Sequence, residues 1–275
     1  MILSSPHVHT TFCDGKSTAE EQVRSALSHG CQSLGFSGHA PQRFDPPCCM
    51  SLENEAAYIA EIRRLQAAYA GRIRIWMGLE LDLFSCADTA RYDYIIGSVH
   101  YLPAKDGFTA VDGDIPALQR LLQDEFHGDG LAMTEEYYRL YAALMRCRRP
   151  LIGGHFDLVR KYNKALRLFD EEAPRYRAAA MNALRAAREA GAVLEVNTGG
   201  IARYGAEAPY PGPALLKAWR EMGGRVILSS DCHFAPDIVA GYAQAARLLL
   251  EIGYKSVCVL GTADETLAET GLEPI

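Results

Sequence analysis

Two histidines separated by one residue stand at the end of the first apolar run of the chain. His7 and His9 follow residues 1–6, and Asp14 comes five residues later. The apolar run predicts a short strand, in which residues two apart point to the same face. The two imidazoles would then aim at one point, as two ligands of a metal ion do. A His-x-His pair alone is equally typical of a surface strand, so it indicates a metal site only if further ligands join it.

Further polar residues of the metal-binding types stand at the ends of the later apolar runs. In chain order they are His39, Glu80 with Asp82, His100, His155 with Asp157, Asn197, and Asp231 with His233. Together with His7 and His9, the set contains six of the eight histidines of the chain. The other two, His29 and His127, are expected on the surface. If the runs are parallel strands of a barrel, all these residues lie on the rim where barrel enzymes carry their active sites.

Such a set exceeds what one tetrahedral ion can use, so the residues predict a multinuclear centre with a carboxylate such as Glu80 bridging two ions. Imidazole and carboxylate together suit zinc, iron and manganese. The alternative is a rim of histidines that form ordinary hydrogen bonds. It would leave many crowded polar groups poorly paired.

The elements that must position these residues alternate along the chain. Strands are expected near 1–8, 32–40, 72–82, 92–100, 150–159, 191–198, 224–233 and 256–261. Helical patterns lie between them: a capping box of Ser17 with Glu20 starts one helix, and glycines end those near 176–191 and 214–224. This alternation predicts a parallel sheet and, at 275 residues, a single (β/α) barrel domain spanning 1–275. The long segment 101–149 is expected to insert two helices that cap one barrel end.

Composition narrows the function further. The net charge of −6 argues against a nucleic-acid-binding surface, and no apolar run is long enough to span a bilayer. Eight scattered cysteines without a CxxC pair predict reduced thiols and a cytoplasmic location. We therefore expect a small-molecule partner, with neither nucleic acid nor membrane involved. The chain has no GxSxG motif, no P-loop and no CxxxxxR cradle, which leaves metal-assisted hydrolysis as the favoured chemistry.

The ordered motifs HVHTTFCDG, SGHA, GLELD, SVH, GGHFDLVRKYN, EVNTGG and SSDCH resemble those of the polymerase-and-histidinol-phosphatase (PHP) superfamily. The likeness is greatest to its histidinol-phosphate phosphatase branch and extends from residue 7 to residue 233. The resemblance implies a distorted seven-stranded (β/α) barrel with three divalent transition-metal ions, and the run SVCVLG would then lie outside the barrel. It also implies hydrolysis of L-histidinol phosphate to L-histidinol and phosphate, a step of histidine biosynthesis.

The resemblance also implies a role for each motif residue. One ion would be held by His7, His9, Glu80 and Asp231, a second by Glu80, His100 and His155, and the third by Asp14, His39 and His233. Glu80, Asp231 and His233 are expected to act in catalysis. Arg160, Arg203 and Asn197 are expected to bind the substrate, because a guanidinium matches phosphate oxygens with two parallel hydrogen bonds. Lys161 and Arg43 are weaker candidates, and Asp157 could read the rest of the substrate.

Two alternatives remain open at this point. Another PHP-type phosphoesterase could act on nucleotides or other small phosphate esters, although the acidic charge disfavours DNA. A non-enzymatic metal-binding protein is the other alternative. It is disfavoured because all nine expected ligands are present.

Overall fold

Nine strands form the main sheet of the computed structural model, which describes residues 2–45 and 47–273. In spatial order they are β1 (Ser4–Ser5), β2 (Ser33–Phe36), β3 (Arg74–Asp82), β4 (Tyr94–Ser98), β7 (Ile152–Gly153), β8 (Val193–Asn197), β9 (Val226–Ser229), β10 (Ser256–Leu260) and β11 (Leu267–Gly271). All neighbours from β1 to β10 pair in parallel, and only β11 joins in the antiparallel sense. The predicted parallel α/β architecture is confirmed.

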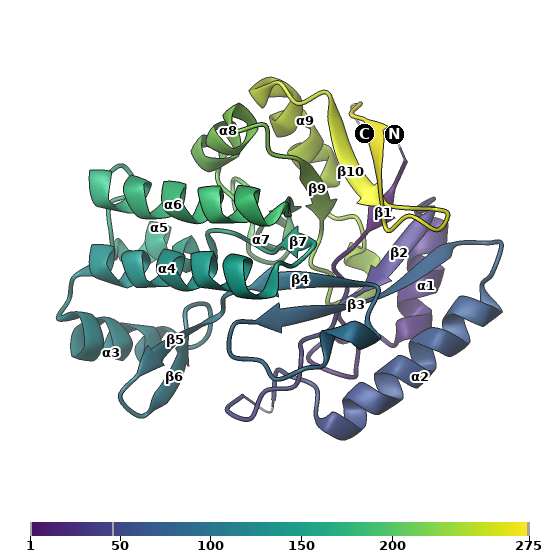
Figure 1. Cartoon of the computed structure of the whole chain (residues 1–275), viewed down its shortest axis with the longest axis horizontal. Coiled ribbons are helices and arrows are strands. Elements are labelled where there is room, and N and C mark those ends of the chain that lie inside the picture. Colours follow the sequence, from purple (N-terminus) through teal and green to yellow (C-terminus); the bar gives the residue numbers. More distant parts are fainter. Residues whose placement is uncertain (1, 46, 274–275) are drawn as a thin grey trace.

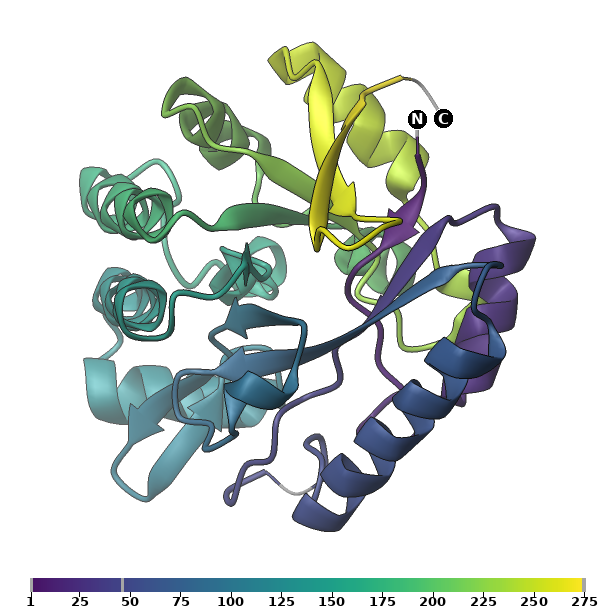
Figure 2. The same ribbon diagram turned by 45° about the vertical axis from the view of Figure 1, so that its right-hand side comes forward.

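The first and seventh strands of this row, β1 and β9, approach each other at their carboxyl ends. Just beyond β1 and β9, Val8 and Cys232 form a parallel bridge, in which the amide of His9 donates to Cys232 at 2.8 Å and the amide of Cys232 donates to His7 at 2.9 Å. Strand β10 continues the row beyond β9, and its Leu260 also exchanges hydrogen bonds with the hydroxyls of Ser4 and Ser33, so the run SVCVLG is part of the sheet and not separate from it. Figures 1 and 2 show the strands at the centre and the helices around them.

The helices follow the strands in the expected alternation. They are α1 (Ala19–Ser28), α2 (Leu52–Ala68), α3 (Ile115–Phe126), α4 (Gly130–Arg148), α5 (Asn163–Leu166), α6 (Pro174–Ala190), α7 (Gly199–Tyr204), α8 (Pro213–Glu221) and α9 (Tyr242–Ile252). Helix α6 ends, as predicted, at Gly191, whose φ of +79° suits a residue without a side chain. The capping box of α1 is one residue later than predicted, because Thr18 and Glu21 form it while the Ser17 hydroxyl accepts a hydrogen bond from the amide of Ala235.

Segment 101–149 differs from the prediction. It begins with a hairpin, β5 (Tyr101–Ala104) and β6 (Gly107–Ala110), which the sequence analysis missed. The two predicted helices follow, but α4 does not cap the barrel: it runs beside α6 on the outside and provides the crossover from β4 to β7 (Figure 1). Its buried face is rich in leucine, methionine and tyrosine, so burial against the sheet and α6 accounts for its position.

Side chains alternate between the two faces of each strand and fill different cores. On β3, Met77, Leu79 and Leu81 belong to the cluster beneath α1 and α2, whereas Trp76 belongs to an inner cluster. The fully or nearly buried members of that inner cluster are Trp76, Tyr94, Ile96, Ile152, Val193, Ile227, Cys258 and Leu260. The inner face is therefore apolar at the amino ends of the strands, and the polar residues lie beyond it.

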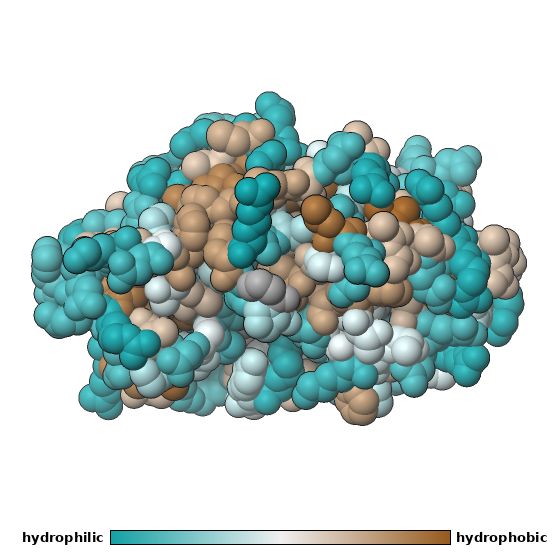
Figure 3. Space-filling view, turned by 90° about the horizontal axis from the view of Figure 1, so that it is seen from below, coloured by the Kyte–Doolittle hydropathy of each residue, from teal (hydrophilic) through white to brown (hydrophobic). Residues whose placement is uncertain are grey.

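The outer surface is mixed in character. Figure 3, seen from below Figure 1, shows hydrophilic side chains over much of that face, with smaller hydrophobic groups between them. The most exposed large hydrophobic residues within the described part of the chain are Leu52, Phe108, Tyr204 and Phe234. No helix among the described residues is both long and apolar enough to cross a membrane.

Candidate metal centre

The carboxyl ends of the seven strands bring all nine predicted ligands together. His7 and His9 follow β1, His39 follows β2, and Glu80 lies within β3. His100, His155 and the pair Asp231 and His233 follow β4, β7 and β9, while Asp14 comes from the loop after β1. His7 and His9 are fully buried, and the side chain of Asp14 is the most accessible of the nine at 27%.

Glu80 occupies the middle of this group. Its side chain is 1% exposed and both of its oxygens face imidazoles. Oε2 lies 3.0 Å from His39 Nδ1, 3.2 Å from His7 Nε2 and 3.4 Å from His9 Nε2, while Oε1 lies 2.9 Å from His155 Nε2 and 3.5 Å from His100 Nε2. A carboxylate that faces ligands on both oxygens has the arrangement that a bridging ligand requires.

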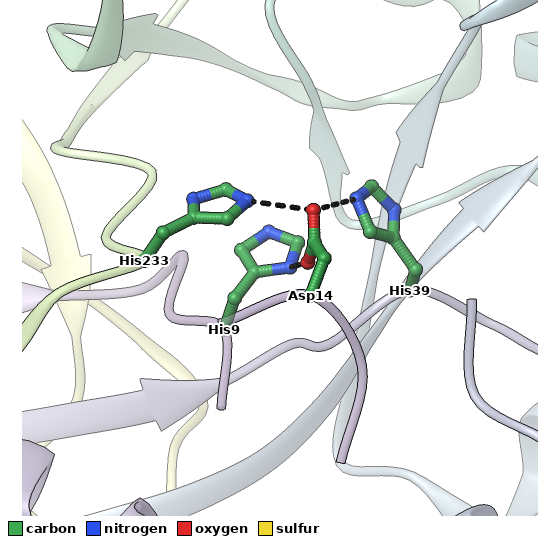
Figure 4. A group of neighbouring side chains, drawn as sticks. All are labelled: His9, Asp14, His39 and His233. Atoms are coloured by element: carbon green, nitrogen blue, oxygen red, sulfur yellow. Dashed lines mark hydrogen bonds and ion pairs between the residues drawn. The ribbon is translucent and has the colours of Figure 1, made fainter. Parts of the chain in front are cut away.

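Asp14 organises a second group, drawn in Figure 4. Its Oδ2 lies 3.2 Å from His233 Nε2 and 3.7 Å from His39 Nε2, and its Oδ1 lies 3.2 Å from His9 Nδ1. The rings of His9 and His233 stack at 4.0 Å. His9 therefore lies beside this group as well as beside Glu80. The resemblance assigned His9 only to the ion that His7, Glu80 and Asp231 would hold.

Asp231 closes the centre on the β9 side. Its Oδ1 lies 3.3 Å from His9 Nε2 and 3.6 Å from His7 Nε2. Its backbone has a φ of +49°, which is uncommon for a residue with a side chain and marks a position where surrounding contacts fix the backbone. Its amide donates to the hydroxyl of Ser229, one such contact.

Unpaired buried atoms in the centre show that its residues fit a metal ion. His7 Nε2, His9 Nε2 and Glu80 Oε2 are buried without a hydrogen-bond partner among the described residues, although buried polar atoms are normally paired. They form one compact group of ligand atoms. Their separations of 3.2 and 3.4 Å match the roughly 3.3 Å between ligand atoms around a tetrahedral ion with bonds of about 2.0–2.1 Å.

The opposite charges of carboxylates and imidazoles in the centre shift the pKa values of both kinds of group. Burial alone would lower the pKa of His7, but the carboxylates of Glu195, Glu80 and Asp231 outweigh it and raise that pKa to about 10. Burial opposes ionisation of Glu80, yet the surrounding imidazoles hold its pKa well below the usual range. Without metal, then, protons on imidazoles neutralise the carboxylates, and a bound cation would take over that role.

Two buried carboxylates lie behind the ligands: Asp82, which was expected on the rim without an assigned role, and Glu195, which was not predicted. Glu195, on β8, is fully buried: its Oε1 lies 2.6 Å from His7 Nδ1, and its Oε2 accepts from the amide of His155 at 2.6 Å. Asp82 accepts from the amide of His100 at 2.8 Å. Such contacts fix the orientation of a ligating imidazole. The alternation along β8 was the available signal, because Glu195 is two residues before Asn197.

Of the predicted substrate-binding residues, Arg203 lies at the centre. Its Nη2 donates to Asp231 Oδ2 at 2.9 Å, and its Nη1 donates to the carbonyl oxygen of Asp231 and lies 3.2 Å from His233 Nδ1. The guanidinium borders a cavity of about 660 Å³ that opens onto the ligands. Tyr204 and Lys161 line the same cavity.

Arg160 and Asn197 do not line this cavity, so direct substrate contact does not match their positions. Arg160 is held by Asp157 at 2.7 Å and Glu171 at 2.8 Å, because the short turn that follows Asp157 directs its side chain away from the cavity and leaves Lys161 facing it. Asn197 is 1% exposed and donates to Glu195 and Asp231, so it positions carboxylates. Asp157 is fully buried beneath the cavity.

Comparison with known proteins agrees with this geometry. The family model of the PHP domain matches residues 5–199. The chain is 32% identical, over 93% of its length and 95% of the relative's, to a protein of Deinococcus radiodurans named probable histidinol-phosphatase. It is 29% identical to the histidinol-phosphatase of Bacillus subtilis, over 88% of this chain and 97% of that one.

A solved structure has the same fold. The histidinol phosphate phosphatase of Lactococcus lactis, crystallised with zinc, L-histidinol and phosphate, superposes with a TM-score of 0.65 at 23% identity, covering 94% of this chain and 97% of that one. The two proteins therefore share their fold over nearly their whole lengths.

Proposed function

The chain belongs to the PHP domain family, and from that premise we propose that it is a histidinol-phosphatase, which hydrolyses L-histidinol phosphate to L-histidinol and phosphate. The observation that carries the proposal is the convergence of nine ligand-type side chains beside an arginine at the floor of one cavity. Relatives with this name match nearly the whole chain, so the resemblance is not confined to the metal-binding motifs.

The nine residues would hold three divalent transition-metal ions, zinc being the ion named in the Lactococcus lactis complex. Glu80 would bridge two of them, with His7, His9 and Asp231 on one side and His100 and His155 on the other; Asp14, His39 and His233 would hold the third. Bound ions of this kind lower the pKa of water toward ~7 and neutralise the charge of a phosphate ester. Glu195 and Asp82 orient the imidazoles of His7 and His100 for this role.

Arg203 and Lys161 are proposed to hold the phosphate. Asp231 fixes the Arg203 guanidinium through two of its nitrogens, which leaves further N–H groups for phosphate oxygens at the cavity wall. Lys161 donates to the backbone of Asp112 at 2.7 Å and lies over the ring of Tyr204, so its ammonium group is also positioned beforehand. Lys161 takes the place that the sequence analysis gave to Arg160.

Glu80, Asp231 and His233 are proposed to act directly on the reaction. Asp231 and His233 both contact Arg203, so they lie at the end of the centre where the phosphate would bind. Glu80 contacts five imidazoles and fixes the spacing of the groups around it. Ligand positions that are set before the substrate arrives lower the reorganisation that the reaction requires.

The test is phosphate release by metal-loaded protein from a panel of esters. We expect L-histidinol phosphate to have the highest kcat/KM, above nucleoside monophosphates, sugar phosphates and a phosphodiester. A diester or a nucleotide hydrolysed faster than L-histidinol phosphate would favour the nucleotide-hydrolase alternative. No turnover of any ester with Zn²⁺, Fe²⁺ or Mn²⁺ would favour a non-enzymatic metal protein.

A further inference from the structure

The cavity above the metal centre has two chemically different ends. A row of five rings lies along the centre, in the order Tyr101, His100, His39, His9 and His233. The centroids of successive rings are 6.0, 5.1, 4.5 and 4.0 Å apart. Arg203 contacts the last ring of this row. Asp45 contacts the first, because its Oδ2 accepts a hydrogen bond of 2.7 Å from the Tyr101 hydroxyl. A cationic end and an anionic end therefore lie on either side of the ligands.

Asp45 differs from most other carboxylates that line the cavity. Asp14, Glu80 and Asp231 face imidazoles, and Asp112 lies 3.5 Å from Lys161 Nζ. Asp45 has no ion pair with any lysine, arginine or histidine in the described part of the chain, and neither does Asp237. An unpaired carboxylate in a cavity wall favours a ligand that carries positive charge.

Neighbouring contacts position Asp45 for such a ligand. The ring of Phe44 packs edge-on against Tyr101 at 4.8 Å and stacks on Phe108 of β6 at 4.3 Å, which ties this loop to the hairpin. The Tyr101 hydroxyl holds Oδ2, and the Asp45 carboxylate lines the cavity.

Resting on the function proposed above, we propose that Asp45, positioned by Tyr101, binds the positively charged end of the substrate and so selects phosphate monoesters that carry a cation. L-Histidinol phosphate has this form, with phosphate at one end and an ammonium group and an imidazole at the other. Its phosphate would lie beside Arg203 and its cationic end beside Asp45. The hairpin, which the sequence did not reveal, would then contribute to substrate selection through Tyr101.

Asp237 is the natural comparison for Asp45. It lies four residues after His233, in the short helix Ala235–Asp237, and so belongs to the Arg203 end of the cavity. A substrate whose phosphate occupies that end would carry its cation away from Asp237. The two carboxylates thus share their charge and their lack of an ion pair, but they differ in which end of the cavity they line.

The experiment compares D45N with D237N on two esters, L-histidinol phosphate and p-nitrophenyl phosphate, which carries no cation. We expect D45N to lower kcat/KM for L-histidinol phosphate by about ten- to a hundredfold, mainly through KM, as loss of a charge-assisted contact does. Its kcat/KM for p-nitrophenyl phosphate and its metal content should stay within about twofold of wild type. D237N should leave both esters within about threefold of wild type.

Two outcomes would overturn the proposal. One is an equal fall in the kcat/KM of D45N for both esters, and the other is a D237N variant whose kcat/KM falls for L-histidinol phosphate alone. A Y101F variant gives a second measure and should show the same substrate pattern with a smaller loss. D45E, which keeps the charge, should recover part of the activity on L-histidinol phosphate.

The same measurements keep the two proposals apart. If wild type hydrolyses O-phosphoethanolamine as fast as L-histidinol phosphate, the proposed function fails. Asp45 is then judged with O-phosphoethanolamine as the cationic ester in place of L-histidinol phosphate. A D45N variant that retains wild-type discrimination between O-phosphoethanolamine and p-nitrophenyl phosphate would contradict the cation subsite whatever the physiological substrate is.

Discussion

The inner faces of the strands carry two layers of buried side chains, one apolar and one polar. At the amino ends, Trp76, Tyr94 and Ile96 pack with other apolar side chains and are almost fully buried. Four residues after Trp76 on the same face of β3, Glu80 is also buried, but both of its oxygens face imidazoles. Gly78 separates the layers on β3, where a Cβ atom would lie only 2.3 Å from the Tyr94 ring. Burial is thus equal in both layers, and only the chemistry differs.

This difference indicates what each layer does. Apolar burial stabilises the fold by about 25 cal/mol per Å². Buried carboxylates and imidazoles instead cost free energy unless they are paired. Among the described residues, five atoms of the nine ligand side chains are buried without a hydrogen bond: His7 Nε2, His9 Nε2, Asp14 Oδ1, Glu80 Oε2 and His155 Nδ1. The amino-end layer therefore carries stability, while the rim carries binding and chemistry. Substitutions in the two layers should separate these properties.

The largest expected effect comes from Glu80→Gln. The amide is nearly isosteric but removes the charge that would neutralise two ions, so we expect kcat to fall by roughly a thousandfold or more. The midpoint of urea unfolding should change little compared with the loss of activity. Near-wild-type turnover by the metal-loaded variant would show that Glu80 is a structural carboxylate and that the rim does not have the role assigned to it.

Ile96→Ala tests the other layer. Removing three buried carbons from a fully buried side chain should lower the free energy of unfolding by about 2–5 kcal/mol. The kcat of the folded fraction should stay within about twofold of wild type, because Ile96, the β4 partner of Glu80 in the ladder, supplies no ligand atom itself. A variant that unfolds normally but loses its bound metal would mean that the two layers are not separable.

Arg203→Ala should have a smaller effect, confined to the substrate. Loss of charge-assisted hydrogen bonds worth roughly 1.5–3 kcal/mol predicts a fall in kcat/KM of about ten- to a hundredfold for any phosphate monoester. Lysine should restore part of it, since a point charge lacks the fork geometry. Arg160→Ala is the matched comparison and should reduce kcat/KM less, because Asp157 and Glu171 already hold that guanidinium. A greater loss in the Arg160 variant would restore the original assignment.

The smallest expected effect is a release of protons. The pKa of His7 is about 10 in the metal-free protein, and those of His9 and His39 are also raised against the effect of burial. These raised pKa values predict that metal binding displaces protons from the imidazoles, so metal affinity should rise with pH. Zn²⁺ added to stripped protein in weak buffer should release about one proton or more per chain, and less as the pH approaches 10. Binding of Zn²⁺ without release of protons would contradict this link between metal binding and imidazole protonation.

Much of the site could be predicted because a strand has a period of two. His7 with His9, and Asp231 with His233, are read directly from that spacing, and parallel strand ends gather on one rim. Glu195 was missed because it stands inside an apolar run, where a buried charge is not expected. Its partner is a histidine 188 residues away, which the local sequence does not contain.

The direction of side chains outside regular elements could not be predicted. Arg160 and Lys161 are adjacent, and the short helix Leu158–Arg160 decides which one faces the cavity. The two possible capping boxes of α1 both satisfy the sequence rule, since Ser17 and Thr18 each have a glutamate three residues later. The hairpin β5–β6 has two strands of four residues, and β6 has no buried residue, so it lacks the apolar alternation that identified the others.

The central claim, that the rim is a multinuclear metal centre on which the phosphatase activity depends, is tested most directly by elemental analysis of chelator-free protein alongside its turnover of L-histidinol phosphate. We expect close to three transition-metal ions per chain, loss of turnover when a chelator removes them, and recovery when Zn²⁺, Fe²⁺ or Mn²⁺ is returned. A reproducible content of one ion per chain with full activity, or full activity after the metal has been removed, would contradict it.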